Sequence, residues 1–586
     1  MESSPHLRKP QLNRSHCQDK YQKEDMFATV RKGLKPLIVL SAGAAGISFE
    51  RRGRPDQSAF CERMVGPLAT SASTTTTITS QTTTVAFDKV AKLSDQQISN
   101  WSGTHLSEPS TIYEPRNAEE VVSVLQACSQ RGHKIRPVGS ALSPNGLGMN
   151  GKTGNLLSVS DIDYVHCDKE NRLVTVGAGA TVHKVLKELL KHDLTLENFS
   201  SIQEQQIAGW TQVAAHGTGC GLPSVEEQIV KMKMATCEKG VLTLSNEENP
   251  ELFKFAKVGL GCLGVVTELT LRCIPRMSLH EKTNMYTKKS IGGQEHLKRL
   301  RENRHVRYMW IPYTDAVLSV TSNPVPSTTP SRQISKHDID HTKNPLAELY
   351  SELKKVPYNE AASKGFGELR DVLLDMNPLD TTHVKTVNAA EAGYWKSTEG
   401  ERIADSTDVL GFDCGGQQLV VEVCFPIGQA TTEGHNETKD IDFVKELIMS
   451  LEKAGVAAPS PIEQRWTARS TAPMSPCYSE NERDIFSWVG IIMYLPAGQT
   501  PEDRENIRRS FEEYKVGVLG PLMKKYNART HWAKIELPYY ETERHRIFAM
   551  RKSLRRDYPI DEFNRWRMIL DPNNILTNDT LDQLFR

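Results

Sequence analysis

The chain has 586 residues, of which 38% are hydrophobic, so it can bury a large core and should divide into more than one domain. Lys and Arg together number 72, as do Asp and Glu, and this balance excludes recruitment of nucleic acid by a global positive field. The 11 cysteines show no Cys-x-x-Cys spacing, so we expect no metal site and mostly buried thiols in a reducing compartment.

The N-terminal residues differ in composition from the rest of the chain. Residues 26–49 contain no acidic residue but several cations, which is typical of a mitochondrial transit peptide. Residues 1–25 contain four acidic residues, which suit a presequence poorly, so Met26 is an alternative start. The apolar run at 36–49 is shorter than the roughly 20 residues that span a bilayer, which favours targeting over an anchor. We expect residues 1–95 to be a targeting and low-complexity leader.

Beyond the leader, the hydrophobic periodicity predicts an α+β protein. Residues 118–131 carry apolar positions at helical spacing, and a short strand over 134–138 follows them. A second unit of this kind runs from a strand at 173–176 through a glycine turn to an amphipathic helix at 181–192. The proline-rich segment 323–345 should form a surface loop in the second half of the chain.

Two glycine motifs match nucleotide-binding patterns but lie in the wrong local context. Residues 146–153 fit the Walker A pattern, yet a predicted strand at 155–160 follows where a helix is required. Residues 259–264 fit the dinucleotide fingerprint, yet they follow a helix at 250–257 and precede a strand at 265–272, the reverse of a Rossmann unit. We therefore expect neither kind of site, although these glycines allow close backbone approach to another cofactor.

Four longer strings carry a family resemblance. They are Asn100–His105, Arg136–Asn145, Pro461–Arg469 and His531–Lys534, and together they resemble the aldonolactone oxidoreductases of the vanillyl-alcohol-oxidase superfamily, from about Asn100 to the C-terminus. The resemblance implies a two-domain α+β flavoprotein. Its FAD-binding domain should span residues 100–275, and its cap (substrate) domain residues 276–586, with a C-terminal extension that returns to the flavin.

Glycine loops of this family cradle FAD, because backbone N–H groups in turns can meet the charges of its pyrophosphate. By resemblance, the cofactor-binding residues are Pro137, Val138, Gly139, Ser140, Ala141, Leu142, Ser143, Gly177, Gly179, Ser201, Gly209, Ala214, His216, Gly217, Thr218, Gly219, Gly264 and Val265. Leu142 stands where many members carry the histidine that bonds the flavin. Leucine has no nucleophilic atom, so FAD should be held non-covalently. His216 could be an alternative anchor, but it resembles a histidine that stays unmodified, which favours a structural role.

The segment 196–202 bears on how the flavin meets oxygen. By resemblance, Ser200 occupies the position that controls oxygen access, where glycine accompanies oxidase behaviour and alanine accompanies dehydrogenase behaviour. Serine is at least as large as alanine, so its size favours a dehydrogenase, whereas its hydroxyl departs from both patterns. A loop serine that bonds its own backbone is a compatible alternative.

The resemblance also supplies candidate catalytic residues. Glu463 and Arg465 alternate in sequence, so a strand would present both on one face, as would an exposed salt bridge. The family pattern favours substrate binding, in which Arg465 holds lactone oxygens and Glu463 orients a hydroxyl or assists proton removal. Lys534 resembles a lysine whose charge stabilises the reduced flavin or the developing enolate. Ser201 completes the predicted catalytic set.

One cysteine is a candidate for redox sensitivity. Cys414, in a glycine-rich stretch, resembles a family cysteine near the active site whose oxidation accompanies inactivation. The alternative is an inert buried thiol, because reactivity requires exposure and a lowered pKa.

The resemblance implies FAD-dependent oxidation of L-galactono-1,4-lactone to L-ascorbate, with cytochrome c as electron acceptor. The expected location is mitochondrial, at the inner membrane or in the intermembrane space. Two alternatives stay open. The first is an oxygen-using oxidase of L-gulono- or D-arabinono-lactone, which peroxide formation would reveal, and the second is a flavoprotein that mainly assembles respiratory complex I.

Overall fold

The computed structural model of the chain describes residues 87–94, 96–151, 154–335, 344–411, 415–429 and 437–585, all within the second of its two units, residues 68–586. The expected transit peptide and Cys414 lie outside the described residues. Two short elements, η1 (Phe87–Lys89) and β1 (Ala91–Leu93), fall within the expected leader. Because β1 pairs with a strand of the first sheet and Val90 is buried, the folded part begins before position 95.

Two larger sheets and four α-helices lie in the described residues up to position 275. The first sheet is mixed, in the order β1, β4 (Ile112–Glu114), β6 (Asn155–Ser158) and β5 (Ile135–Val138). The second is antiparallel, in the order β11 (Gly240–Ser245), β10 (Ile229–Thr236), β12 (Val265–Arg272), β8 (Leu173–Gly177) and β7 (Val165–Asp168). The helices are α3 (Ala118–Arg131), α4 (Val182–Leu190), α5 (Ile207–Gln212) and α6 (Pro250–Ala256).

Local sequence signals explain these elements. The side chain of Asn117 accepts a hydrogen bond from the Glu120 N–H where α3 begins, and Gly132 takes a φ of 66° where it ends. The helix α3 and the strand β12 have the predicted bounds, and β5, β6, β8, α4 and α6 differ from theirs by one or two residues. The strand β6 follows the Walker-like glycines, and the fingerprint-like glycines lie between α6 and β12, so the predicted local context of both motifs is confirmed.

A nine-stranded antiparallel sheet dominates the second half. Its order is β17 (Arg332–Ser335), β18 (Gly400–Asp405), β14 (Met277–Thr287), β16 (Ala316–Pro326), β15 (His305–Trp310), β20 (Ile462–Ala468), β21 (Ile485–Tyr494), β19 (Gln418–Gly428) and β22 (Arg529–Thr530). Alternate residues of β20, such as Trp466, enter a core shared with the helices α7 (Gly293–Glu302), α13 (Lys439–Ala454) and α14 (Pro501–Glu513). Glu463 and Arg465 belong to the opposite face of the sheet.

The remaining elements complete the described chain. Helices accompanying the large sheet are α7 (Gly293–Glu302), α8 (Pro345–Lys354), α9 (Tyr358–Ala362), α10 (Phe366–Met376), α11 (Thr381–Ser397), α12 (Ser406–Leu410), α13 (Lys439–Ala454), α14 (Pro501–Glu513), η3 (Tyr514–Leu519) and α15 (Gly520–Tyr526). Short pairs are β2 (Ile98–Ser99) with β3 (Leu106–Ser107) and β9 (Leu194–Thr195) with β13 (Ile274–Pro275), and short turns are η2 (Val225–Gln228), η4 (Trp532–Lys534) and η5 (Glu541–Glu543). Within the described ranges, no helix is long and apolar enough to cross a bilayer.

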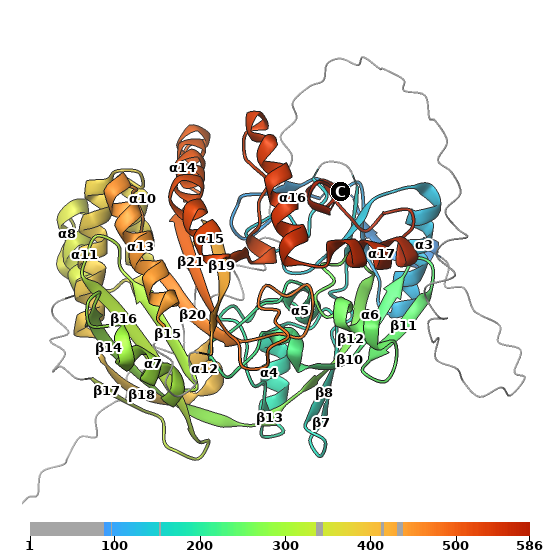
Figure 1. Ribbon diagram of the computed structural model, residues 1–586, viewed down its shortest axis with the longest axis horizontal. Helices are drawn as coiled ribbons and strands as arrows, with labels where there is room; N and C mark the ends of the chain where they lie inside the picture. Colours follow the sequence, from blue (N-terminus) through green and yellow to red (C-terminus); the bar gives the residue numbers. More distant parts are fainter. Residues whose placement is uncertain are drawn as a thin grey trace, which may run out of the picture. The chain divides into compact units, whose positions relative to one another are not determined.

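The C-terminal helices pack against the first half of the chain. α16 (His545–Asp557), α17 (Ile560–Leu570) and α18 (Asp579–Phe585) contribute to the same core as α3, α4 and α6, and Figure 1 shows α17 near α3. The N–H of Ile135 in β5 donates to the Ile575 carbonyl at 2.8 Å. Lys134 donates to the Asn574 carbonyl at 2.6 Å and pairs with Asp582 at 3.0 Å. The end of the chain therefore completes the first core.

The prediction for the proline-rich segment was wrong in part. Residues 323–326 continue β16 and pair with β14, with Leu279 opposite Pro324 and Met277 opposite Pro326. Proline lacks the N–H that a ladder needs, but here β15 no longer pairs beyond Ser322, so the prolines occupy an edge. The strand β17 also falls in this segment, whereas residues 336–343 lie outside the described residues.

Candidate active site

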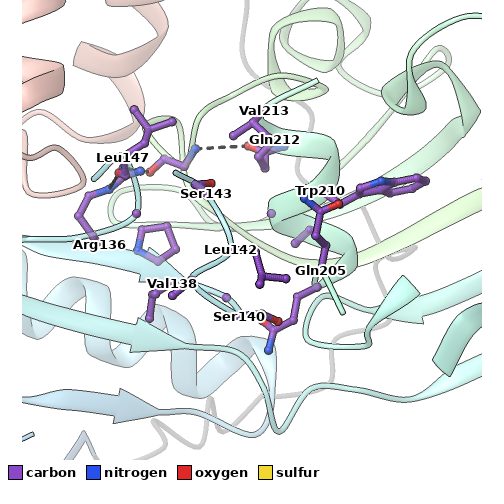
Figure 2. A pocket seen from close by; sticks show the side chains of 18 of the residues that line it. Arg136, Val138, Ser140, Leu142, Ser143, Leu147, Gln205, Trp210, Gln212 and Val213 are labelled. Carbon is purple, nitrogen blue, oxygen red and sulfur yellow. Dashed lines mark hydrogen bonds between the residues drawn. The ribbon is translucent and has the colours of Figure 1, made fainter. Parts of the chain in front are cut away.

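A cavity lies between three segments of the first half of the chain, and Figure 2 shows the side chains that line it. The first segment is the loop after β5, and the second is α5 with the residues that precede it. The third is the loop before β12, which carries the fingerprint-like glycines. Predicted cofactor residues that line the cavity are Pro137, Val138, Gly139, Ser140, Ala141, Leu142, Ser143, Gly209, Gly264 and Val265.

A buried arginine fastens these loops together. Arg136, at the base of the cavity, donates to the backbone carbonyls of Leu147, Leu260 and Gly261 at 2.8–3.1 Å, and also to that of Leu576. Arg136 is 2% exposed, and the carbonyl oxygens of the protein accept the hydrogen bonds of its guanidinium. We therefore conclude that Arg136 fixes the geometry of these loops. The cavity offers backbone groups to a ligand in place of this cationic side chain.

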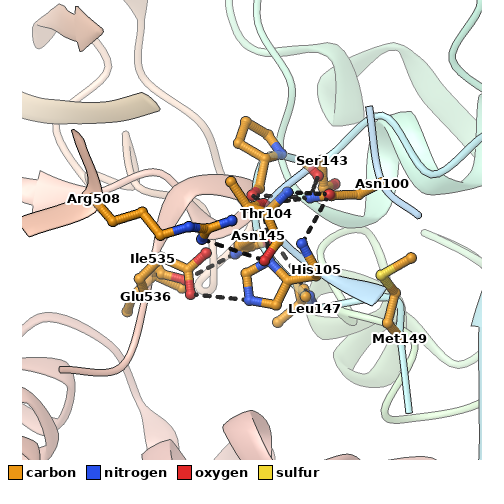
Figure 3. A network of polar contacts seen from close by, with 12 residues as sticks. Asn100, Thr104, His105, Ser143, Asn145, Leu147, Met149, Arg508, Ile535 and Glu536 are labelled. Carbon is orange, nitrogen blue, oxygen red and sulfur yellow. Dashed lines mark hydrogen bonds and ion pairs between the residues drawn. The ribbon is translucent and has the colours of Figure 1, made fainter. Parts of the chain in front are cut away.

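Three of the four family strings are linked by hydrogen bonds (Figure 3). The Asn100 side chain donates to the carbonyls of Ser143 and Pro144, both at 3.0 Å, so the first string holds the loop after β5. In the same loop, Asn145 donates to the Trp532 carbonyl at 2.8 Å. The turn that carries Lys534 is thereby attached to the wall of the cavity.

Two of the predicted catalytic side chains, those of Arg465 and Lys534, converge on a carboxylate that sequence reasoning missed. Glu422, in β19, accepts a hydrogen bond from Arg465 at 2.8 Å through one oxygen and pairs with Lys534 through the other. Arg465 Nε lies 3.5 Å from Glu463 Oε2, so its guanidinium stands between two carboxylates. We call Glu422, Glu463, Arg465 and Lys534 the charged cluster. The Arg465 side chain is only 11% exposed, so the pair with Glu463 is not a solvated surface pair.

Histidines and a tryptophan border the charged cluster. His216 Nε2 lies 3.2 Å from Glu422, and its Nδ1 donates to the Gly217 carbonyl at 3.0 Å. Its ring stacks on Trp488, with ring centres 3.9 Å apart. Burial lowers the pKa values of both His216 and His531.

The comparisons place the chain among known proteins. Two family models match it: one described as an FAD binding domain over residues 109–245, and one described as D-arabinono-1,4-lactone oxidase over residues 269–584. The mitochondrial L-galactono-1,4-lactone dehydrogenase of Arabidopsis thaliana is 42% identical over 503 residues, covering 83% of this chain and 81% of that protein. The chain belongs to the L-galactono-1,4-lactone dehydrogenase family.

The L-galactono-1,4-lactone dehydrogenase family has more distant relatives among oxidases. L-gulonolactone oxidase of Scyliorhinus torazame is 27% identical over 497 residues, covering 83% of this chain and 98% of that protein. Among solved structures, a solvent-stable cholesterol oxidase matches with a TM-score of 0.65 at 16% identity, covering 85% of this chain and 99% of that one. The predicted α+β vanillyl-alcohol-oxidase-type fold and the FAD cofactor are thereby confirmed.

The cavity suits the FAD of this family. A Cβ added to Gly209 of α5 would meet no atom within 4 Å, so the cavity is open above that helix face. Ala141, which also lines the cavity, has a φ of 53°, and left-handed turns of this kind can present backbone N–H groups to an anion. Leu142 lines it with carbon atoms alone, as non-covalent binding requires. FAD supplies a hydride acceptor when it is bound.

The other predicted cofactor residues do not line this cavity. They are Gly177, Gly179, Ser201, Ala214, His216, Gly217, Thr218 and Gly219. A Cβ on Gly177 would lie 2.3 Å from the Ile162 carbonyl oxygen, and a Cβ on Gly179 would lie 2.0 Å from the Val159 carbonyl oxygen. Close packing is therefore enough to explain why both positions are glycine. The segment 217–219 reaches the large sheet, where the Gly219 N–H donates to the Trp466 carbonyl at 2.7 Å. Their contacts with FAD stay predictions.

The hydroxyl of Ser200 is engaged within its own segment. Its Oγ donates to Gln205 Oε1 at 2.6 Å and accepts from Trp210 Nε1 at 3.0 Å. Ser200 is 9% exposed, so its side chain is held in a fixed position. The two hydrogen bonds fix the space that its Cβ and Oγ occupy, which is the property that an oxygen gate requires.

One triad in the site also has the spacing of metal ligands. His216, Glu422 and His531 each place a ligand atom within 4.8 Å of the others. However, both oxygens of Glu422 already contact basic side chains, and their positive charge opposes a metal cation at the same carboxylate. The absence of a metal stays a prediction.

The missed carboxylate carried a signal in the sequence. Residues 419–425 are apolar except for Glu422, and a lone ionisable residue in such a strand requires a partner. Arg307 of β15 was also missed. It lies opposite Arg465 in the sheet and 3.9 Å from Glu463, an arrangement that only strand pairing reveals.

Proposed function

We propose that the chain oxidises L-galactono-1,4-lactone to L-ascorbate in mitochondria, using FAD and passing electrons to cytochrome c. Support comes from its 42%-identical relative, a mitochondrial L-galactono-1,4-lactone dehydrogenase. The observation that carries the proposal is the convergence of Arg465 and Lys534 on one buried carboxylate, Glu422, with Glu463 3.5 Å from Arg465. A mitochondrial cytochrome c partner would place the enzyme at the inner membrane or in the intermembrane space.

Each member of the charged cluster has a proposed role in this reaction. The carbon next to the lactone carbonyl loses a hydride to FAD, and its hydroxyl loses a proton. Arg465 would hold the lactone oxygens, because its planar guanidinium donates several hydrogen bonds. Glu463, whose side chain is 24% exposed, would orient the hydroxyl and accept its proton. Lys534 would stabilise the negative charge that develops as the ketone enolises to the ene-diol.

The domain assignment and the flavin contacts belong to the same proposal. Residues 100–275 would bind FAD, and residues 276–586 would form the cap and the C-terminal return. Ser200 would limit oxygen access, and Ser201 would contact flavin and substrate. The two core clusters support this division, because one contains the cavity and the other the large sheet.

An oxygen-using aldonolactone oxidase is the second candidate. It is favoured by the 27%-identical L-gulonolactone oxidase and by the departure of Ser200 from alanine. Steady-state assays with L-galactono- and L-gulono-lactone, each with cytochrome c or oxygen as acceptor, would decide between the two. Peroxide formed at the rate of lactone consumption would establish the oxidase. A main role in complex I assembly would instead be indicated if a variant without Glu463 and Arg465 still rescued assembly.

Alanine substitutions test the site assignment. We expect Glu463→Ala and Arg465→Ala each to retain FAD yet lose most lactone turnover, with the larger loss of affinity for Arg465→Ala. A hydrogen bond to a charged group contributes about 1.5–3 kcal/mol, or roughly 10- to 150-fold. Glu482→Ala, which breaks an exposed pair with Arg469, is the matched control. Wild-type kcat/KM in both site variants would contradict the assignment.

A further inference from the structure

Glu422 is a buried carboxylate in an otherwise apolar part of β19. Its side chain is 2% exposed, and its neighbours Val421 and Val423 belong to the core on the other face of the sheet. Burying a carboxylate costs several kcal/mol unless charged partners offset the loss of water. Burial raises the pKa of Glu422, but Lys534, His216 and Arg465 outweigh it and hold the pKa well below its usual range.

Both oxygens of Glu422 are occupied by protein groups. Oε1 contacts Arg465 Nη2 at 2.8 Å and His216 Nε2 at 3.2 Å, and Oε2 contacts Lys534. The backbone carbonyl of Glu422 also accepts from the His531 N–H at 3.0 Å. One residue of β19 therefore fixes both the guanidinium on β20 and the turn that carries Lys534.

We infer that Glu422 is a positioning residue that holds Arg465 and Lys534 together at the lactone site. The inference deepens the proposed function and rests on it. Arg465 and Lys534 are both cations, so they repel each other when they point into one site. The carboxylate of Glu422 between them offsets this repulsion, and the three groups together carry one net positive charge. Glu463 also contacts the guanidinium of Arg465, at Nε, so the fork has a set orientation before the lactone arrives.

The test replaces Glu422 by glutamine, which keeps the shape and removes the charge. The probe is a 2-deoxy-aldono-1,4-lactone, which lacks the reacting hydroxyl and therefore binds without being oxidised. Its dissociation constant is measured from the change in flavin absorbance. We expect Glu422→Gln to retain FAD and to bind the probe roughly 10-fold or more weakly, because Arg465 loses its holder.

Coupling to Arg465 separates positioning from a general structural effect. In an Arg465→Ala background, Glu422→Gln should weaken probe binding much less than it does in the parent, because the group that it positions is gone. The matched control is Glu281→Gln, a similarly buried carboxylate on β14 that pairs with Arg402 at 2.6 Å. This control should bind the probe like the parent.

Three results would overturn the inference. Parent-like affinity of Glu422→Gln is the first, and losses that multiply with those of Arg465→Ala are the second. If Glu422→Gln cannot be purified with FAD, Glu422→Gln/Lys534→Met removes the carboxylate with one of its cations. We expect that double variant to regain FAD and still bind the probe weakly. Loss of FAD there as well would be the third result, because it would assign Glu422 to the fold alone.

The proposed function fails separately from this inference. A parent enzyme that neither oxidises an aldonolactone nor binds the probe would refute the function. A parent enzyme that does both, with an unaffected Glu422→Gln variant, would refute only the positioning role.

Discussion

At the residue scale, Leu142 determines how the cofactor is attached. It lines the cavity, and its carbon side chain cannot form a bond to the flavin's 8α-methyl carbon. We expect acid precipitation to release all FAD into the supernatant as yellow colour. Colour that stays with the protein pellet after washing would show a covalent link through another residue.

Ser200 makes a second prediction at this scale, because its side chain is fixed by Gln205 and Trp210. Glycine at this position removes Cβ and Oγ, so Ser200→Gly should speed reoxidation of the reduced enzyme by oxygen and leave lactone oxidation little changed. Stopped-flow reoxidation at fixed oxygen measures this. A glycine variant as slow as the parent would exclude Ser200 as the gate.

Alanine is the matched control for Ser200. Its methyl group still fills the space, so Ser200→Ala should remain slow with oxygen. The change also leaves Trp210 Nε1 without its acceptor, which should lower the free energy of unfolding by about 1–3 kcal/mol. A stable protein that reacts faster with oxygen would show that polarity, and not size, controls access.

At the scale of elements, the strand β21 separates the two carboxylates of the site. Gly490 lies directly opposite Glu463 on one side and Glu422 on the other. An added Cβ would stay 4.0 Å from Glu422 Oε1 and from the Glu463 carbonyl oxygen, so the sheet leaves room between the two carboxylates. A larger side chain would fill this space on the face that carries the charged cluster.

We therefore expect Gly490→Val to raise KM for the lactone by roughly 10-fold or more, since its methyl groups occupy the room needed by substrate. Valine suits a strand, so FAD content and thermal unfolding should change little. Gly490→Ala should behave almost like the parent, because its Cβ makes only ordinary contacts. Equal KM values for all three proteins would place the lactone elsewhere.

Elements with local cues were predictable from the sequence, and those formed by distant pairing were not. The helix α3 carries its cap, its apolar face and its terminal glycine within one short segment. The strand order of the large sheet depends on pairs of distant residues, such as Ser278 with Asp405, which no local sequence pattern predicts. For the same reason the alternation of Glu463 and Arg465 was visible in the sequence, whereas the strand pairing that brings Glu422 to them was not.

At the scale of the whole described unit, a buried histidine links acid sensitivity to the contact between the two cores. His305 of β15 donates to the Thr218 carbonyl at 2.8 Å, where the glycine segment meets the large sheet. Burial lowers the pKa of His305 to about 4. Unfolded histidine has a pKa near 6.5, so the unfolded chain binds more protons between these values.

Stability should accordingly fall as the pH drops from about 6.5 to about 4, and His305 should contribute up to about 3 kcal/mol of that loss. Replacing His305 by glutamine should flatten the dependence in this window. Urea unfolding at several pH values measures it. Glutamine at the exposed His133 is the control and should leave the slope unchanged. An unchanged slope in the His305 variant would assign the acid sensitivity to other groups.

The return of the C-terminus has a consequence for the order in which the protein can be made. Leu581, Leu584 and Phe585 are buried in the same core as α3, and the Leu576 carbonyl receives a hydrogen bond from Arg136 at the base of the cofactor cavity. A ribosome adds these residues after all the others that form this core. The half of the chain that is synthesised first must therefore stay incompletely packed until these residues emerge, and the cofactor cavity is complete only then.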